Sequence, residues 1–111
     1  MSKEFLTGIY PGTFDPVTFG HLDIVARATN IVNKLIISVA SNEHKSPFFS
    51  LKERIIMLEK SITKTMKENC DVIVTGFDNL LVDHAKKNNA QVIIRGPVSY
   101  THLRAHETTN Y

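Results

Sequence analysis

The chain has very little cysteine, little net charge and no long apolar run, and each absence removes a class of protein. Its one cysteine, Cys70, excludes an internal disulfide and fits a reducing compartment. A formal net charge of +2 is too small to predict nucleic acid or an acidic membrane as a partner. The longest apolar stretches, such as residues 35–40, are too short to cross a bilayer. Since the polar start also lacks a signal-peptide pattern, we expect a cytoplasmic protein.

Two familiar phosphate-binding motifs are missing as well. The sequence contains neither the Gly-Lys-Ser/Thr of a P-loop nor the Gly-x-Gly-x-x-Gly dinucleotide fingerprint. It shows no internal repeat and no linker, and 111 residues with 42% hydrophobic content suit one globular domain at most. Cys70 is interpreted as a small hydrophobic residue entering a strand, because no basic microenvironment that would activate a thiolate is evident nearby.

The apolar pattern predicts short strands alternating with helices. The strands are expected at residues 5–10, 34–40, 71–75 and 91–94, and the helices at 20–32, 50–67 and 79–89. The second helix has an apolar stripe at spacings of three and four: Leu51, Ile55, Leu58, Ile62 and Met66. Ser50 and Glu53 form a capping box at its start. This alternation predicts an α/β fold, a Rossmann-like doubly wound parallel sheet.

The densest chemical signal joins the first strand to the first helix. Residues 10–21 read Tyr-Pro-Gly-Thr-Phe-Asp-Pro-Val-Thr-Phe-Gly-His, just past the carboxyl end of a strand, where open α/β sheets bind ligands. Gly12 and Gly20 allow the backbone to approach a ligand closely, while the two prolines stiffen the loop. His21 falls in the first helical turn, where free backbone N–H groups favour a phosphate.

These residues carry a resemblance. Thr18-x-Gly20-His21 resembles the Thr/His-x-Gly-His signature of the nucleotidylyltransferase superfamily, and the twelve-residue string closely resembles the phosphopantetheine adenylyltransferase family. The similarity continues through the loop of Lys45, Pro-x-Phe-Ser-Leu-x-Glu-Arg at 47–54, Gly-Phe at 76–77 and Ile-Arg-Gly at 94–96. It covers roughly residues 5–96. The resemblance implies the nucleotidylyltransferase fold and a step of coenzyme A biosynthesis: adenylyl transfer from ATP to 4′-phosphopantetheine, giving dephospho-CoA and pyrophosphate.

The resemblance also implies roles for individual residues. His21 would be the catalytic donor to the α-phosphate of ATP. The residues implied in ATP binding are Thr13, Phe14, His21 and Gly96, and those implied in binding the acceptor are Thr13, Lys45, Leu81 and Arg95. Mg²⁺ is expected to enter with ATP, held mainly by phosphates and waters, and we identify no protein ligand for it. By resemblance alone, the assembly is a homo-hexamer.

Ordinary explanations compete for several of these positions. Thr13 would also suit a turn in which its hydroxyl bonds its own backbone. Lys45 would equally suit a solvated loop, and Leu81 would suit the core. A site role for Arg95 is also supported by the expected fold, because the commonest winding sets its buried strand beside the first one. A charge there needs a partner, and a phosphate suits a guanidinium.

Three other polar side chains have simpler explanations than a role in the reaction. Asp15 would hold the loop or approach the metal, although a turn-forming aspartate is the simpler interpretation. His44 and His84 are both expected on the surface.

The resemblance stops after Gly96. The run from Val98 to Thr108 resembles a translated sequencing adapter, so we expect a domain at residues 1–96, incomplete at its C-terminus, and a non-native tail at 97–111. Such a sheet would expose an edge, and we expect this chain to be unstable or inactive although the intact gene product is an enzyme. His102 and His106 could share a helical face, but without a third ligand we do not expect a metal site.

Three other functions were considered. One is a nucleotidylyltransferase acting on another phosphorylated acceptor, such as nicotinamide mononucleotide or glycerol phosphate; those relatives usually have histidine where Thr18 stands. Another is a nucleotide-binding module without catalysis. A purely structural α/β domain explains the periodicity but leaves the clustered loop unexplained.

Overall fold

The computed structural model describes residues 5–41, 47–78, 80–95, 99–104 and 107–108. Strands and helices alternate as the sequence predicts, up to the fourth strand. In chain order the elements are β1 (Thr7–Gly12), α1 (Phe19–Ala28), β2 (Lys34–Ala40), α2 (Leu51–Ser61), α3 (Lys64–Asn69), β3 (Asp71–Phe77), α4 (Leu81–Lys87), β4 (Val92–Arg95), β5 (Ser99–Arg104) and β6 (Glu107–Thr108).

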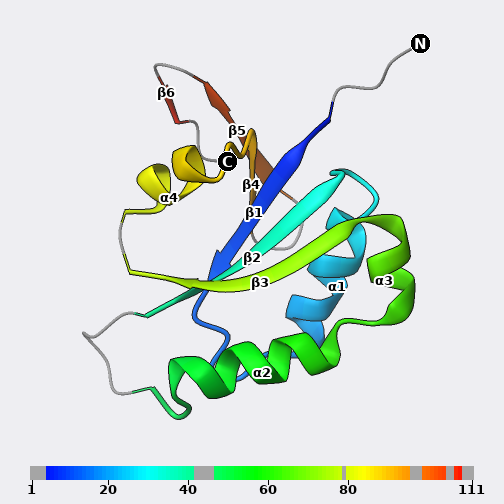
Figure 1. Cartoon of the computed structure of the whole chain (residues 1–111), viewed down its shortest axis with the longest axis vertical. Coiled ribbons are helices and arrows are strands. Elements are labelled where there is room, and N and C mark those ends of the chain that lie inside the picture. Colours follow the sequence, from blue (N-terminus) through cyan, green and yellow to red (C-terminus); the bar gives the residue numbers. More distant parts are fainter. Residues whose placement is uncertain (1–4, 42–46, 79, 96–98, 105–106, 109–111) are drawn as a thin grey trace.

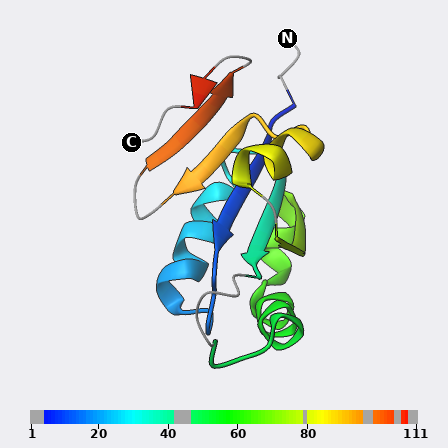
Figure 2. The ribbon, with the colours of Figure 1, turned by 90° about the vertical axis from the view of Figure 1, so that its left-hand side faces the viewer.

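The strands form one sheet in the order β3-β2-β1-β4-β5-β6. The first four in this order are parallel, and Ile9 of β1 is paired with Ile36 of β2 on one side and Ile93 of β4 on the other. Figure 2 shows the arrowheads of β1, β2 and β4 pointing the same way and that of β5 pointing back. The predicted Rossmann-like α/β class is therefore confirmed, and so is the placement of the fourth strand beside the first.

Helices cover both faces of the sheet. Figure 1 shows α1 and α3 on one side of the strands and α4 on the other. The larger apolar cluster lies on the α1 side and includes Val25, Leu35, Ile37, Leu58 and Ile94, whereas the smaller cluster joins Ile9, Ile36, Ala85 and Ala90 under α4. Since successive strand residues face opposite ways, burying both faces requires the nearly continuous apolar runs seen in the sequence.

The predicted helix at 50–67 is wrong in one respect, because it is two helices. Ile62 is extended, with φ −72° and ψ 120°, and the Thr63 side chain caps α3 by accepting the Met66 N–H at 3.2 Å. A threonine hydroxyl that bonds the backbone competes with continued helix at this point. Ile62 is still only 7% exposed, so the apolar stripe survives the break. The capping box of Ser50 and Glu53 is confirmed by two reciprocal bonds of 2.9 and 3.1 Å.

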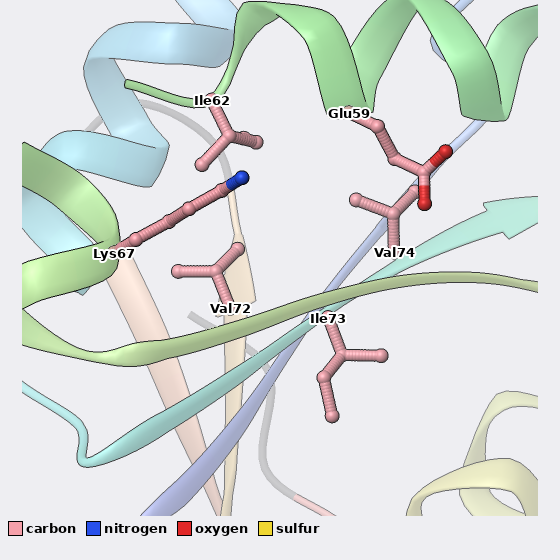
Figure 3. A pocket seen from close by; sticks show the side chains of 6 residues that line it. All are labelled: Glu59, Ile62, Lys67, Val72, Ile73 and Val74. Carbon is pink, nitrogen blue, oxygen red and sulfur yellow. The ribbon is translucent and has the colours of Figure 1, made fainter. Parts of the chain in front are cut away.

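The two edges of the sheet differ in what lies beside their strands. The sequence predicts an exposed edge on the side of the fourth strand. The structure covers β4 itself, because β5 is paired antiparallel with it, with Val92 opposite His102 and Arg95 opposite Ser99. The outer strand at the other side is β3. A hollow of about 290 Å³ lies beside it, between β3 and the residues Glu59, Ile62 and Lys67. Figure 3 shows the side chains of Val72 and Val74 on one side of β3 and that of Ile73 on the other. Within the described ranges, none of the helices has the length and apolar character needed to cross a membrane.

Candidate active site

The topology brings the predicted loop to a switch point of the sheet. The connections from β1 to β2 and from β2 to β3 run over one face, and the connection from β3 to β4 runs over the other. Helices that leave β1 and β3 therefore diverge at the carboxyl ends of the strands, where open α/β sheets bind ligands. The loop at residues 13–18 follows β1 directly at this place.

Phe14 anchors the loop through its buried side chain. Its side chain is 1% exposed, and its ring meets the rings of Tyr10 and His21 edge-on at centroid distances of 5.3 and 4.8 Å. Its backbone adopts φ 49°, a left-handed conformation that bulky residues rarely take. A Cβ on Gly12 would lie 3.0 Å from the Phe14 ring, so glycine at this position leaves room for the ring to pack. A buried ring thus holds a strained backbone beside the helix start.

Thr18 and His21 form a capping box at the start of α1. The Thr18 hydroxyl accepts the backbone N–H of His21 at 3.3 Å, and the backbone N–H of Thr18 donates to Nδ1 of His21 at 3.0 Å. The third helical position in such a box is usually glutamate or glutamine. Histidine performs the same cap without placing a carboxylate beside a possible anion site. This cap was not predicted, although the spacing of three between Thr18 and His21 is its signal in the sequence.

The cap also decides which nitrogen of His21 carries the proton. A backbone N–H can only donate, so Nδ1 must accept, and the neutral ring holds its hydrogen on Nε2. Burial lowers the pKa of His21, and the Thr18 N–H at Nδ1 favours the same neutral form. Nε2 makes no hydrogen bond to any residue that the structure describes. The ring is therefore fixed with one donor available.

Two charged side chains tie this loop to the segment before α2. The Asp15 carboxylate accepts the backbone N–H groups of Phe48 and Phe49 at 2.7 and 2.9 Å, so Asp15 holds the loop and uses both oxygens to do so. Arg54 is 4% exposed and donates to the carbonyl oxygen of Thr13 at 2.9 Å. Arg54 had no predicted role, although its position between Leu51 and Leu58 puts a charge on the apolar face of the helix.

The other predicted site residues lie as follows. Thr13 is exposed in the loop, and Leu81 is half-buried at the first position of α4, packed on the smaller apolar cluster. Arg95 ends β4 with an exposed side chain. It follows Ile93, the partner of Ile9, by two residues, so it comes level with the end of β1.

His21 and Arg95 therefore both lie at the carboxyl ends of the strands. His21 comes from the α1 face, and strand alternation directs Arg95 to the α4 face. Lys45 and Gly96 lie outside the described residues. No three His, Cys, Asp or Glu side chains come together as a metal site within the ranges that the structure describes.

His84 lies in the interior rather than on the surface as expected, because it is only 7% exposed. Its Nε2 lies 2.8 Å from the hydroxyl of the fully buried Ser38, and its ring stacks on Phe77 at 4.7 Å. Burial, followed by the charge of Lys87, lowers its pKa. Cys70 is 5% exposed and burial raises the pKa of its thiol, in agreement with a packing role.

Comparison with known proteins places the chain in a family. The cytidylyltransferase-like family matches residues 9–110. The phosphopantetheine adenylyltransferase of a Ruegeria species is 50% identical over 90 residues, which are 80% of this chain and 54% of that protein. The enzyme of the same name from Caulobacter vibrioides is 53% identical over 89 residues, with the same coverage. The chain thus spans about half the length of the curated relatives it matches.

Solved structures support the fold. A lipopolysaccharide core biosynthesis protein from Thermoplasma volcanium superposes with a TM-score of 0.62 at 18% identity, over 81% of this chain and 73% of its own. A bifunctional NMN adenylyltransferase/ADP ribose pyrophosphatase from Francisella tularensis, complexed with AMP and a manganese ion, gives 0.54 at 20% identity, over 78% of this chain and 26% of its own. At these identities the likeness concerns architecture alone.

Proposed function

Because the chain belongs to the cytidylyltransferase-like family, we propose that it carries the phosphate-handling site of an adenylyl transfer from ATP to 4′-phosphopantetheine. The products are dephospho-CoA and pyrophosphate. The observation that carries the proposal is the Thr18–His21 cap, which leaves the Nε2–H of a neutral imidazole available at a helix start. Relatives of about 50% identity named phosphopantetheine adenylyltransferase support the choice of acceptor.

The reaction needs alignment and charge stabilisation more than acid–base chemistry. A phosphate monoester has a second pKa of about 6, so the acceptor is already ionised at neutral pH and needs no general base. Its oxygen forms a bond to the α-phosphorus of ATP while the bond from that phosphorus to the bridging oxygen breaks, and pyrophosphate leaves. His21 would donate its Nε2–H to the α-phosphate, where negative charge accumulates.

Backbone groups would supply further donors. The N–H groups of Phe14, Phe19 and Gly20 have no hydrogen-bond partner within the described part of the chain, and the latter two belong to the first turn of α1. The positive end of the helix dipole favours a phosphate at this position. A Cβ on Gly20 would meet no atom closer than 3.6 Å, so this side of the turn is open to a ligand.

The acceptor would approach from the α4 face. Arg95 at the end of β4 and Lys45 would bind its phosphate, with Thr13 between the two reactants. Leu81, half-buried beside the smaller apolar cluster, would contact the pantetheine arm. Mg²⁺ would arrive as the magnesium complex of ATP, coordinated by phosphates and water. A cytoplasmic location and a homo-hexameric assembly complete the proposal.

One assay with two readouts tests the function. Magnesium ATP is titrated into the ¹⁵N-labelled chain while the His21 ring and the Gly20 amide are followed by NMR, and pyrophosphate and dephospho-CoA are measured after adding 4′-phosphopantetheine. Shifts at both groups with product formation support the proposal. Absence of any shift at His21 would refute it.

The same assay separates the alternatives. Binding without product indicates a nucleotide-binding module, which also fits our expectation that this chain is inactive. Transfer to nicotinamide mononucleotide or glycerol phosphate, in preference to phosphopantetheine, would instead indicate a different nucleotidylyltransferase.

A further inference from the structure

Arg54 is a buried cation with an unusual set of partners. It lies in the first turn of α2 and is 4% exposed. Its Nε donates to the carbonyl oxygens of Phe49 and Ser50 at 3.0 and 3.4 Å, and its Nη1 donates to those of Thr13 and Ala40, each at 2.9 Å. Among the described residues it meets no carboxylate. A buried charge is costly unless hydrogen bonds satisfy it, and here neutral carbonyl groups do so.

These carbonyl groups come from three segments that meet at the candidate site. Thr13 begins the loop after β1, Ala40 ends β2, and Phe49 precedes α2. Asp15 adds a second link between the first and third segments through its bonds to the N–H groups of Phe48 and Phe49. Arg54 therefore fixes the loop relative to two neighbouring elements, which a single hydrogen bond would not achieve.

The bond to Thr13 also determines where the next N–H points. The peptide bond between Thr13 and Phe14 is trans, so its C=O and N–H groups point in opposite directions. Arg54 draws the Thr13 carbonyl oxygen into the interior, and the N–H of Phe14 must face away from it. That N–H has no partner within the described part of the chain, and the neighbouring Thr13 side chain is exposed. A cation on the carbonyl oxygen also polarises the peptide and strengthens its N–H as a donor.

We propose that Arg54 is a positioning residue that holds the Thr13–Phe14 peptide so that the Phe14 N–H faces a bound phosphate. The left-handed backbone of Phe14, φ 49°, agrees with this role, because the conformation is held by the buried ring on one side and by the Arg54 bond on the other. That the ligand is a phosphate rests on the proposed function; the orientation of the peptide does not.

The test compares Arg54→Met with Arg27→Met by NMR. Arg27 is the matched control, a largely exposed arginine whose side chain pairs with Asp23 at 3.2 Å on α1. In the free Arg54→Met chain we expect the Thr13 carbonyl ¹³C and Phe14 amide resonances to move well beyond the changes in the control. Titration with inorganic pyrophosphate should then show about tenfold weaker binding, the factor for one lost backbone hydrogen bond. The control should bind within about twofold of the unaltered chain.

The outcomes separate a positioning role from a merely structural one. A folded Arg54→Met chain with unchanged Thr13 and Phe14 resonances and unchanged pyrophosphate affinity would overturn the inference, even if its melting temperature fell. If that variant does not fold, Arg54→Lys is used: it keeps the charge but cannot reach all the carbonyl groups with one planar fork, so the same two resonances should move. If the unaltered chain fails to bind pyrophosphate, the proposed function is wrong, while the resonances of the free chains still decide the role of Arg54.

Discussion

His21 and His84 lie on helices that cover opposite faces of one sheet, and they use their ring nitrogens differently. In both rings Nδ1 lies beside an N–H donor, the Thr18 backbone at 3.0 Å and the Asn88 amide at 3.4 Å. Both neutral rings therefore carry their hydrogen on Nε2. His84 uses that hydrogen on Ser38 in the interior, whereas Nε2 of His21 has no partner among the described residues. A fixed ring with one free donor suits a ligand site, and a ring with both nitrogens satisfied suits the core.

The largest effect should follow from removing the His21 ring. His21→Ala should lower the rate of adenylyl transfer about 10²–10³-fold, or 2.7–4 kcal/mol, as for the loss of one oxyanion-hole donor. Dephospho-CoA formation measures the rate, and pyrophosphate titration measures binding if this chain does not transfer AMP. An unchanged rate and affinity in a folded His21→Ala chain would remove the distinction between the two histidines.

The same substitution at the other ring should affect stability instead. His84→Ala should cost about 2–4 kcal/mol in the free energy of unfolding, because it empties a packed position and leaves the buried Ser38 hydroxyl unsatisfied. Urea denaturation measures this. Replacing both partners, Ser38→Ala with His84→Phe, should recover most of the loss, because two apolar groups leave nothing unpaired. A double variant no more stable than His84→Ala would contradict this account.

A smaller effect is expected at the cap that orients His21. Thr18→Ala should lower the free energy of unfolding by about 1 kcal/mol, the usual cost of losing a helix N-cap, and should broaden or shift the His21 ring resonances. Thr18→Ser keeps the hydroxyl and serves as the control. If Thr18→Ala leaves the His21 resonances in place, the hydroxyl is not needed to orient the ring, which is then held by the backbone N–H of residue 18 and by its contacts with Tyr10 and Phe14.

The smallest effect is a pH dependence shared by both histidines. Burial lowers the pKa of each ring, so below an ordinary histidine pKa of about 6.5 the unfolded chain binds protons that the folded chain does not. Stability should be greatest above that pH and should fall as the pH drops from 7.5 through 6.5 toward each folded pKa. Urea midpoints across this range measure the slope, which should be shallower in the Ser38→Ala, His84→Phe variant. An equal slope would assign the dependence to His21 alone.

Much of the fold could be predicted because its determinants are local. The strand at 34–40, the cap of Ser50 and Glu53 and the apolar stripe of α2 all follow from residues a few positions apart. The position of Arg95 at the end of a strand beside β1 followed from the same alternation and from the commonest winding. The loop at residues 10–21 could be recognised by its sequence alone.

The sequence by itself determined where β1 to β4 and most of the helices between them lie, and it singled out the loop that joins the first strand to the first helix. Only the tertiary structure decided that His84 is buried against Ser38, 46 residues away, and that Arg54 bonds Thr13 across 41 residues. The physical reason is one of distance along the chain. Caps and stripes depend on neighbours one helical turn apart, whereas the partner of a buried polar group is fixed only when separate elements pack together.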